Sequence, residues 1–174
     1  MLPDRREALI LGAVGLGAAA AGALIGAFAL QSQTGAAELL AHSFLDLAGK
    51  PRRLIEWQGR VMVCNFWATW CAPCREEIPL LIAAQQQHSS SMVQIVGIGI
   101  DHADKIVEFA AQLKITYPLL VADSTALDTM KQLGNRSGGL PFTVVLDRRG
   151  VVAKTRLGAL KPGELDLILE PLLR

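Results

Sequence analysis

The chain has 174 residues and a formal net charge of +1, from 17 Lys and Arg against 16 Asp and Glu. This length suits one domain with or without a tail, and the near-zero net charge gives no electrostatic support for nucleic-acid binding. Hydrophobic residues make up 51% of the chain, which excludes an acidic disordered protein, and three cysteines are too few for a disulfide-dense mini-protein.

An apolar stretch over residues 8–30 follows a short charged segment, and it carries no charged or polar side chain over its 23 residues. About 20 predominantly apolar residues are enough to span a bilayer as a helix. Because Arg5 and Arg6 precede the stretch, the positive-inside rule places the N-terminus in the cytoplasm and the rest of the chain outside it. We expect residues 1–30 to form an inner-membrane anchor. The alternative is a cleaved export signal with its small-residue site at residues 27–29.

Residues 31–37 are polar or small and are predicted to be a linker, so that the folded domain covers residues 38–174. Within this domain, the continuous apolar runs at 61–67 and 92–100 predict strands that are buried on both faces. Helical spacing of apolar residues predicts helices over 71–88 and 102–114, and a short strand is expected over 118–122.

A capping residue at Asp123 or Ser124 predicts a helix that runs to Leu133 and ends at Gly134. Two strands, 142–147 and 151–156, follow and are joined by a turn over 147–150. A last helix is expected to begin at Pro162 and to run towards Leu173. This alternation of strands and helices predicts an α/β fold with a mixed sheet.

Cys71 and Cys74 are separated by two residues, at the predicted boundary between a buried strand and a helix. The free N–H groups and the dipole at the start of a helix favour negative charge, so we expect Cys71 to have a lowered pKa and to be the exposed attacking thiolate. Cys74 is the natural buried resolving thiol. Pro73 restricts the backbone between the two cysteines, and Trp70 can shield the site and contact a partner. The pattern therefore predicts thiol–disulfide exchange.

Other interpretations of the two cysteines fit poorly. Covalent haem attachment requires a histidine after the second cysteine, where this chain has Arg75. A structural zinc site requires four ligands, and neither Cys64 nor the three histidines lie at a suitable spacing. Cys64 stands inside the predicted strand over 61–67 and is expected to be a small apolar core residue, with a regulatory disulfide as the alternative.

Two segments resemble the signatures of a known family. Residues 66–79, FWATWCAPCREEIP, and residues 139–147, GLPFTVVLD, with Gly150 after them, are similar to the TlpA-like and ResA-like thiol-disulfide reductases of the thioredoxin superfamily. The resemblance covers residues 38–174. It implies a thioredoxin fold, in which helices flank a central mixed sheet, with one extra βα insert over 102–122.

The resemblance also implies that the peptide bond before Pro141 is cis and that this proline faces the two cysteines. A substrate chain can then pair in extended form with the exposed backbone at Leu140, beside the disulfide. Around the cysteines, the residues expected to contact substrate are Trp70, Ala72, Pro73 and Leu140.

Two polar residues near the motif bear on proton transfer. Asn65 occupies the position where thioredoxin has a buried acid, and an amide cannot take up a proton in its place. Glu77 stands one helical turn after Cys74 and matches an acid of the ResA-like branch. A half-buried carboxylate beside thiols raises their pKa values and moves a proton. The alternative is a solvated helix acid that pairs with Arg75.

Taken together, the residues and the resemblance predict an exported thiol-disulfide oxidoreductase, with Cys71, Cys74, Glu77 and Pro141 as its catalytic residues. The resemblance implies that it reduces periplasmic protein disulfides, with apocytochrome c as the leading substrate. It also implies a membrane thiol electron donor similar to DsbD or CcdA, and it requires no metal or organic cofactor. The alternatives are an oxidase or isomerase of the same fold, a tethered binding module with an inert disulfide, and a thiol peroxidase.

Overall fold

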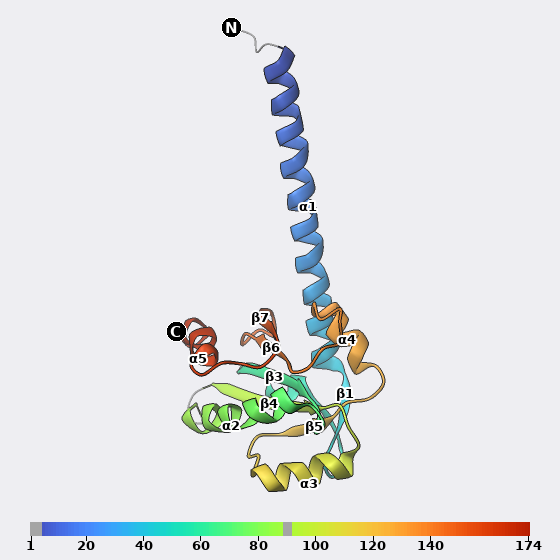
Figure 1. Cartoon of the computed structure of the whole chain (residues 1–174), viewed down its shortest axis with the longest axis vertical. Helices are drawn as coiled ribbons and strands as arrows, with labels where there is room; N and C mark the ends of the chain where they lie inside the picture. The colour runs from blue at the N-terminus through green and yellow to red at the C-terminus, as the bar shows by residue number, and fades with distance from the viewer. Residues whose placement is uncertain (1–4, 89–91) are drawn as a thin grey trace.

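A seven-stranded mixed sheet forms the centre of the domain in the computed structural model, which describes residues 5–88 and 92–174. Its strand order is β2-β1-β5-β4-β3-β6-β7 (Figure 1). In chain order the strands are β1 Ser43–Asp46, β2 Pro51–Arg53, β3 Val61–Trp67, β4 Val93–Gly99, β5 Leu119–Val121, β6 Phe142–Leu146 and β7 Val152–Leu157. The helices are α1 Arg5–Ala41, α2 Ala72–Gln87, α3 Ala103–Leu113, α4 Ala126–Gln132 and α5 Glu164–Leu169, with 3-10 turns η1 Leu54–Trp57 and η2 Glu170–Leu172.

The central strands confirm the predicted mixed sheet. β3 pairs with β4 in parallel and with β6 in antiparallel orientation, and every residue of β3, β4 and β6 is buried. Burial on both faces explains why these strands are continuous apolar runs rather than alternating ones. Helix α3 and strand β5 occupy the predicted insert over 102–122 and extend the sheet beyond β4, where β5 pairs in parallel.

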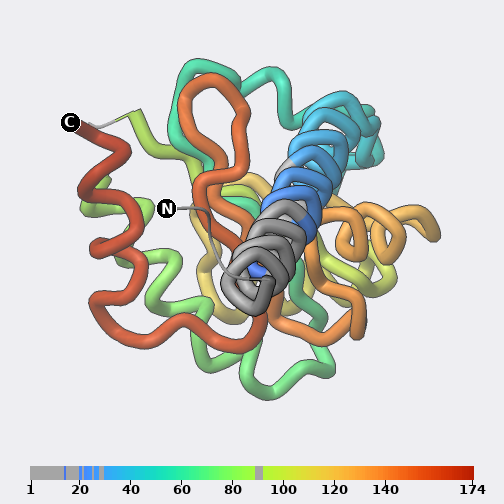
Figure 2. Tube along the Cα trace, turned by 90° about the horizontal axis from the view of Figure 1, so that it is seen from above, coloured from blue at the N-terminus to red at the C-terminus, as the bar shows by residue number. Residues whose placement is uncertain are grey.

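Helices cover both faces of the sheet. Figure 2 shows α2 and α5 on one side and the end of α1 with α4 on the other. The core under α2 contains Trp67 and both Cys71 and Cys74, whereas the opposite core contains Cys64. Cys64 is fully buried, and this burial raises its pKa to about 12, which confirms it as a core residue.

Helix α1 continues through residues 31–37, so the prediction of a linker there is wrong. The physical reason is tertiary packing, because Ala36, Leu39 and Leu40 are buried in the core beneath α4. The helices approach closely at Gly35, where an added Cβ would lie 3.0 Å from Cβ of Gln132. The rest of α1 projects away from the sheet (Figure 1).

The predicted apolar helix over 8–30 lies within α1, but most of its side chains, like residues 1–4, fall outside what the structure describes. Among the described residues, no helix has the length and apolar character that a membrane crossing requires.

The clearest differences from the predicted boundaries are at the last two helices. The N-cap of α4 is Thr125, because Asp123 instead accepts hydrogen bonds from the backbone N and the hydroxyl of Thr125 in the preceding turn. The last helix begins at Glu164 after Gly163, whose φ of 77° is a left-handed conformation. It ends at Leu169 and passes into η2. Strands β1 and β2 and turn η1 have no equivalent in the prediction.

Candidate active site

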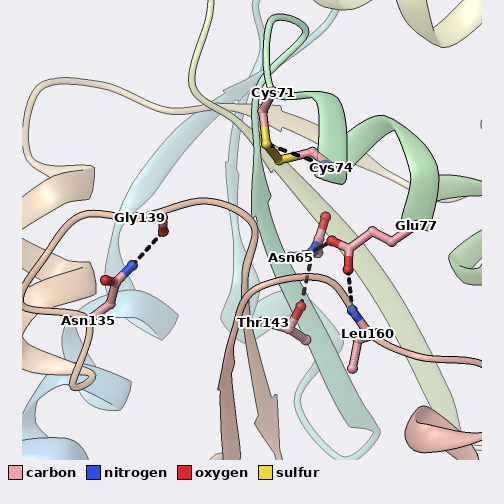
Figure 3. Close-up of a disulfide and its surroundings, with 8 residues drawn as sticks. All are labelled: Asn65, Cys71, Cys74, Glu77, Asn135, Gly139, Thr143 and Leu160. Atoms are coloured by element: carbon pink, nitrogen blue, oxygen red, sulfur yellow. Dashed lines mark hydrogen bonds between the residues drawn. A yellow bond between two sulfur atoms is a disulfide. The ribbon is translucent and has the colours of Figure 1, made fainter.

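Cys71 and Cys74 form a disulfide where the loop after β3 enters α2 (Figure 3). The two sulfurs are 2.03 Å apart and the two Cα atoms 5.3 Å apart. Cys71 is the N-cap residue of α2, and its backbone N donates a hydrogen bond to the carbonyl oxygen of Ala68 at 3.2 Å. Strand β3 and the first turn of α2 therefore fix the position of both sulfurs.

The start of α2 favours negative charge at Cys71. The backbone N of Cys74 donates a hydrogen bond to Cys71 Sγ at 3.3 Å. Pro73 lies in the first turn, at a position where a missing N–H costs the helix no internal hydrogen bond. After reduction, the same N–H group and the helix dipole stabilise a Cys71 thiolate.

The prediction that Cys71 is exposed is wrong for the oxidised state, because this residue is only 6% exposed. Its sulfur is turned towards Cys74 in the disulfide, and the residue belongs to the core under α2. The buried position of Cys74 is confirmed, with an exposed fraction of 0%. Trp70 is 68% exposed, and Ala72 and Pro73 are exposed beside it, so a partner can reach all three side chains.

The peptide bond between Leu140 and Pro141 is cis, as the resemblance implies. Pairing of Phe142 with Phe66 brings this proline to the end of β3 from which the chain continues to the disulfide. Asn135, which the sequence analysis missed, holds the loop before it: its Nδ2 donates a 2.8 Å hydrogen bond to the carbonyl oxygen of Gly139 (Figure 3). The local feature that could have pointed to Asn135 is its place directly after Gly134, the glycine that ends the preceding helix.

Glu77 is buried between α2 and β3, not solvated, and its carboxylate accepts hydrogen bonds at both oxygens. Asn65 Nδ2 donates to Oε1 at 2.7 Å, and the backbone N of Leu160 donates to Oε2 at 2.8 Å. The same Asn65 Nδ2 also donates to Thr143 Oγ1 at 3.0 Å. Figure 3 shows this network on the side of α2 that faces the sheet, and within it Glu77 lies on the same helix as Cys74.

Burial raises the pKa of Glu77 above its ordinary value, and it outweighs the hydrogen bonds from Leu160 and Asn65 and the charge of Arg156, which lower it. Such a carboxyl exchanges protons closer to neutral pH than an exposed one. Thr143 and Leu160 were missed by the sequence analysis, because nothing in their local sequence indicates that they meet a residue of α2.

Among the described residues, no group of three or more His, Cys, Asp and Glu side chains could hold a metal ion. The redox-active group of the site is the Cys71–Cys74 disulfide, with a helix start that stabilises a thiolate on one side and the buried Glu77 carboxyl beneath it.

Comparison with known proteins agrees with this site. Residues 32–168 match the Redoxin family. The chain belongs to this family. It is 30% identical to the thiol-disulfide oxidoreductase ResA of Geobacillus thermodenitrificans, over 72% of this chain and 70% of that protein. It is 27% identical to the thioredoxin-like protein YneN of Bacillus subtilis, over 74% of each chain.

Solved structures agree as well. A thiol:disulfide interchange protein of the thioredoxin family from Chlorobium tepidum superposes with a TM-score of 0.69 at 27% identity, covering 76% of this chain and 93% of that one. A thioredoxin-related protein from Neisseria meningitidis serogroup B superposes with a TM-score of 0.67 at 30% identity, covering 74% and 97%. The fold is therefore thioredoxin-like. This Redoxin-family chain is a ResA-like thiol-disulfide oxidoreductase with a Cys71–Cys74 redox centre.

Proposed function

We propose that this oxidoreductase works outside the cytoplasm and reduces disulfides in exported proteins, with the disulfide formed by the paired cysteines of apocytochrome c as its leading substrate. One observation carries the proposal: the Cys71–Cys74 disulfide lies at the start of α2 in a chain 30% identical to an oxidoreductase named ResA. The family resemblance supports the reducing direction, and the apolar segment over 8–30 supports export.

The reaction begins with the reduced enzyme. The Cys71 thiolate attacks one sulfur of the substrate disulfide, which forms a mixed disulfide and releases the other substrate sulfur as a thiolate. Cys74 then loses its proton and attacks Cys71 Sγ, which releases the second substrate thiolate and forms the Cys71–Cys74 disulfide. Two electrons have passed to the substrate, and its two thiolates take up two protons.

In this reaction Glu77 is the group that accepts the proton of Cys74. The two residues are one turn apart on α2, and both are buried, with exposed fractions of 0% for Cys74 and 3% for Glu77. Water has little access there, so the Cys74 thiol needs an internal base before it can attack. The raised pKa of Glu77 suits a carboxyl that both accepts and returns a proton.

The oxidised enzyme requires two electrons from another dithiol before the next cycle. A membrane thiol donor similar to DsbD or CcdA would supply them by the same exchange in reverse, and the cycle uses no metal or organic cofactor. The exposed Trp70, Ala72 and Pro73 beside the disulfide, together with Leu140, would form the surface on which donor and substrate dock in turn.

We also propose that residues 8–30 tether the enzyme to the inner membrane. Alkaline extraction of membranes from cells that produce the full chain tests this part. A tethered enzyme stays in the membrane pellet, and its N-terminal peptide is found by mass spectrometry. A processed enzyme is released and begins after residue 29.

The direction of electron flow is tested by the reduction potential of the Cys71–Cys74 pair, equilibrated in thiol buffers with free thiols trapped at each point. The reduction potential of thioredoxin is about −270 mV, and that of the strong oxidase DsbA is about −120 mV. We expect a value close to the first. A value close to the second would make the protein an oxidase of exported thiols.

Replacing Trp70 by Ala is expected to raise KM for a protein disulfide about 10-fold while leaving the rate with a small aromatic disulfide within about 2-fold. Trp70 is 68% exposed, so its removal deletes a docking contact and disturbs little of the core. Steady-state kinetics with both substrates measures the effect. An equal loss of activity with the protein disulfide and with the small disulfide would mean that Trp70 acts on the chemistry at the sulfurs and not in docking.

A further inference from the structure

The amide of Asn65 uses only part of its hydrogen-bonding capacity. Asn65 is fully buried on β3, and its Nδ2 group donates to two acceptors, Glu77 Oε1 at 2.7 Å and Thr143 Oγ1 at 3.0 Å. Its Oδ1 is also buried and has no hydrogen-bond partner within the described residues. A buried acceptor without a partner is costly and calls for an explanation.

The other partner of Glu77 determines which carboxyl oxygen receives a proton. The backbone N of Leu160 donates to Oε2 at 2.8 Å, and a backbone N–H can only donate. Oε2 therefore accepts in both protonation states, and the carbonyl oxygen of an acid is a better acceptor than its hydroxyl oxygen. This favours Oε2 as the carbonyl oxygen of the acid form and places the proton on Oε1, which faces Asn65 Nδ2.

Protonation of Oε1 would place an O–H group against the N–H group of Asn65, with two donors facing each other. Rotation of the amide by half a turn removes this conflict, because it brings Oδ1 into the place of Nδ2 and moves the NH2 group to the place where Oδ1 had no partner. Oδ1 then accepts from the Glu77 acid. The Thr143 hydroxyl, which accepted from Nδ2 before, donates to Oδ1 instead, since a hydroxyl serves in either direction.

We infer that Asn65 and Thr143 form a reversible hydrogen-bonding partner for Glu77, which donates to its carboxylate and, after the amide turns, accepts from its acid form. The inference rests on the proposed proton exchange between Cys74 and Glu77. It makes Asn65 and Thr143 positioning residues, which hold the carboxyl in one place in both protonation states.

The other groups that act on Glu77 do not reorganise in this way. Arg156 on β7 lowers its pKa but is itself ion-paired, with Nε 2.7 Å from Glu164 Oε1. Glu164 on α5 raises the pKa of Glu77, and the buried Tyr117 before β5 interacts with it electrostatically. Of the described side chains that hydrogen-bond to Glu77, the Asn65 amide alone can change from donor to acceptor.

The inference is tested by NMR titration of the oxidised full chain in detergent micelles. The Glu77 carboxyl carbon is assigned by its absence in Glu77→Gln, and the Asn65 side-chain amide by its absence in Asn65→Asp. We expect the Asn65 amide signals to shift with the same pH midpoint as the Glu77 carboxyl. Amide signals that stay constant while Glu77 titrates would overturn the inference. The titration is made on the wild-type chain, so its result does not depend on whether a variant folds.

Two variants sharpen the test. In Glu77→Gln the new amide N–H replaces the acid O–H, so we expect the Asn65 amide to show its low-pH signals at every pH. Thr143→Val takes the acceptor away from an Asn65 N–H in the carboxylate state, whereas in the acid state Oδ1 still accepts from Glu77. The substitution therefore costs the carboxylate state more, so the Glu77 midpoint rises by about one pH unit, and Thr143→Ser restores it. An unchanged midpoint in Thr143→Val contradicts the inference.

A separate measurement distinguishes failure of the inference from failure of the proposed function. The rate at which Cys74 resolves a preformed mixed disulfide is measured against pH for wild type and Glu77→Gln. Identical profiles would remove Glu77 from the proton transfer, whatever the amide does. If the two pH profiles of the rate differ and the Asn65 amide signals do not change with pH, the proposed function stands. The reversible partner formed by Asn65 and Thr143 is then excluded.

Discussion

Replacing Cys71 by Ser is expected to lower the rate of protein-disulfide reduction by at least about 1,000-fold, because a hydroxyl at this position cannot replace a thiolate that attacks sulfur. The helix start that stabilises charge on Cys71 Sγ has no comparable effect on a hydroxyl far from its ionisation range. Reduction of insulin, followed by precipitation of its freed chains, measures the loss. The matched control is Cys64→Ala, which removes a buried thiol on the opposite face of the sheet and should retain the activity.

Replacing Cys74 by Ser should instead trap the reaction halfway. The Cys71 thiolate still attacks, but no second thiol resolves the mixed disulfide, so an equimolar adduct with substrate accumulates and is seen on a non-reducing gel. Cys71→Ser should form no such adduct, because Cys74 is 0% exposed and substrate cannot reach it. Adducts formed by Cys71→Ser and absent from Cys74→Ser would reverse the two roles.

Local sequence was sufficient for most of the domain. The strands β3 and β4 were predicted from continuous apolar runs and β6 from its turn to the next strand, and these three are the strands in which every residue is buried. The redox pair was predicted from its spacing and its place before a helix, both of which are local features. Strands β1 and β2 are four and three residues long, too short for a periodic pattern to be visible.

Long-range contacts explain what the sequence analysis missed. The linker prediction failed because Ala36 and Leu39 find buried partners under α4, which composition alone cannot show. The network at Glu77 joins Asn65 to Thr143 across 78 residues and reaches Leu160 across 83. The acid itself was identified as a candidate through resemblance, but its burial and its hydrogen-bond donors required the folded structure.

Replacing Glu77 by Gln is expected to change how stability depends on pH. Burial raises the pKa of Glu77 in the folded state above the ordinary value of 4.5 that it recovers on unfolding. The folded chain therefore binds more protons than the unfolded chain between these two pKa values, and the free energy of unfolding falls as pH rises through that window. The contribution is fully present below 4.5 and is lost above the folded pKa of Glu77.

The amide introduced by Glu77→Gln does not titrate. The free energy of unfolding of wild type minus that of the variant should therefore decrease with pH, by about 1.4 kcal/mol for each unit by which the pKa is raised. Urea denaturation of both oxidised chains at a series of pH values measures this difference. The control is Glu76→Gln, which removes the charge of an exposed neighbour on α2. Its free energy of unfolding should change with pH in the same way as that of wild type. A difference that increases with pH would mean that the hydrogen bonds and Arg156 prevail and that the pKa is lowered.

The sign of this slope bears directly on the chemistry. A carboxyl whose pKa were lowered by its two hydrogen-bond donors would remain ionised at neutral pH and could not hold the proton of Cys74. A carboxyl whose pKa is raised by burial destabilises the fold as it ionises, and the same free energy makes it a better proton acceptor from a thiol. Loss of stability at high pH and proton transfer at Cys74 are thus two consequences of burying Glu77 beneath the disulfide, and Glu77→Gln should remove both.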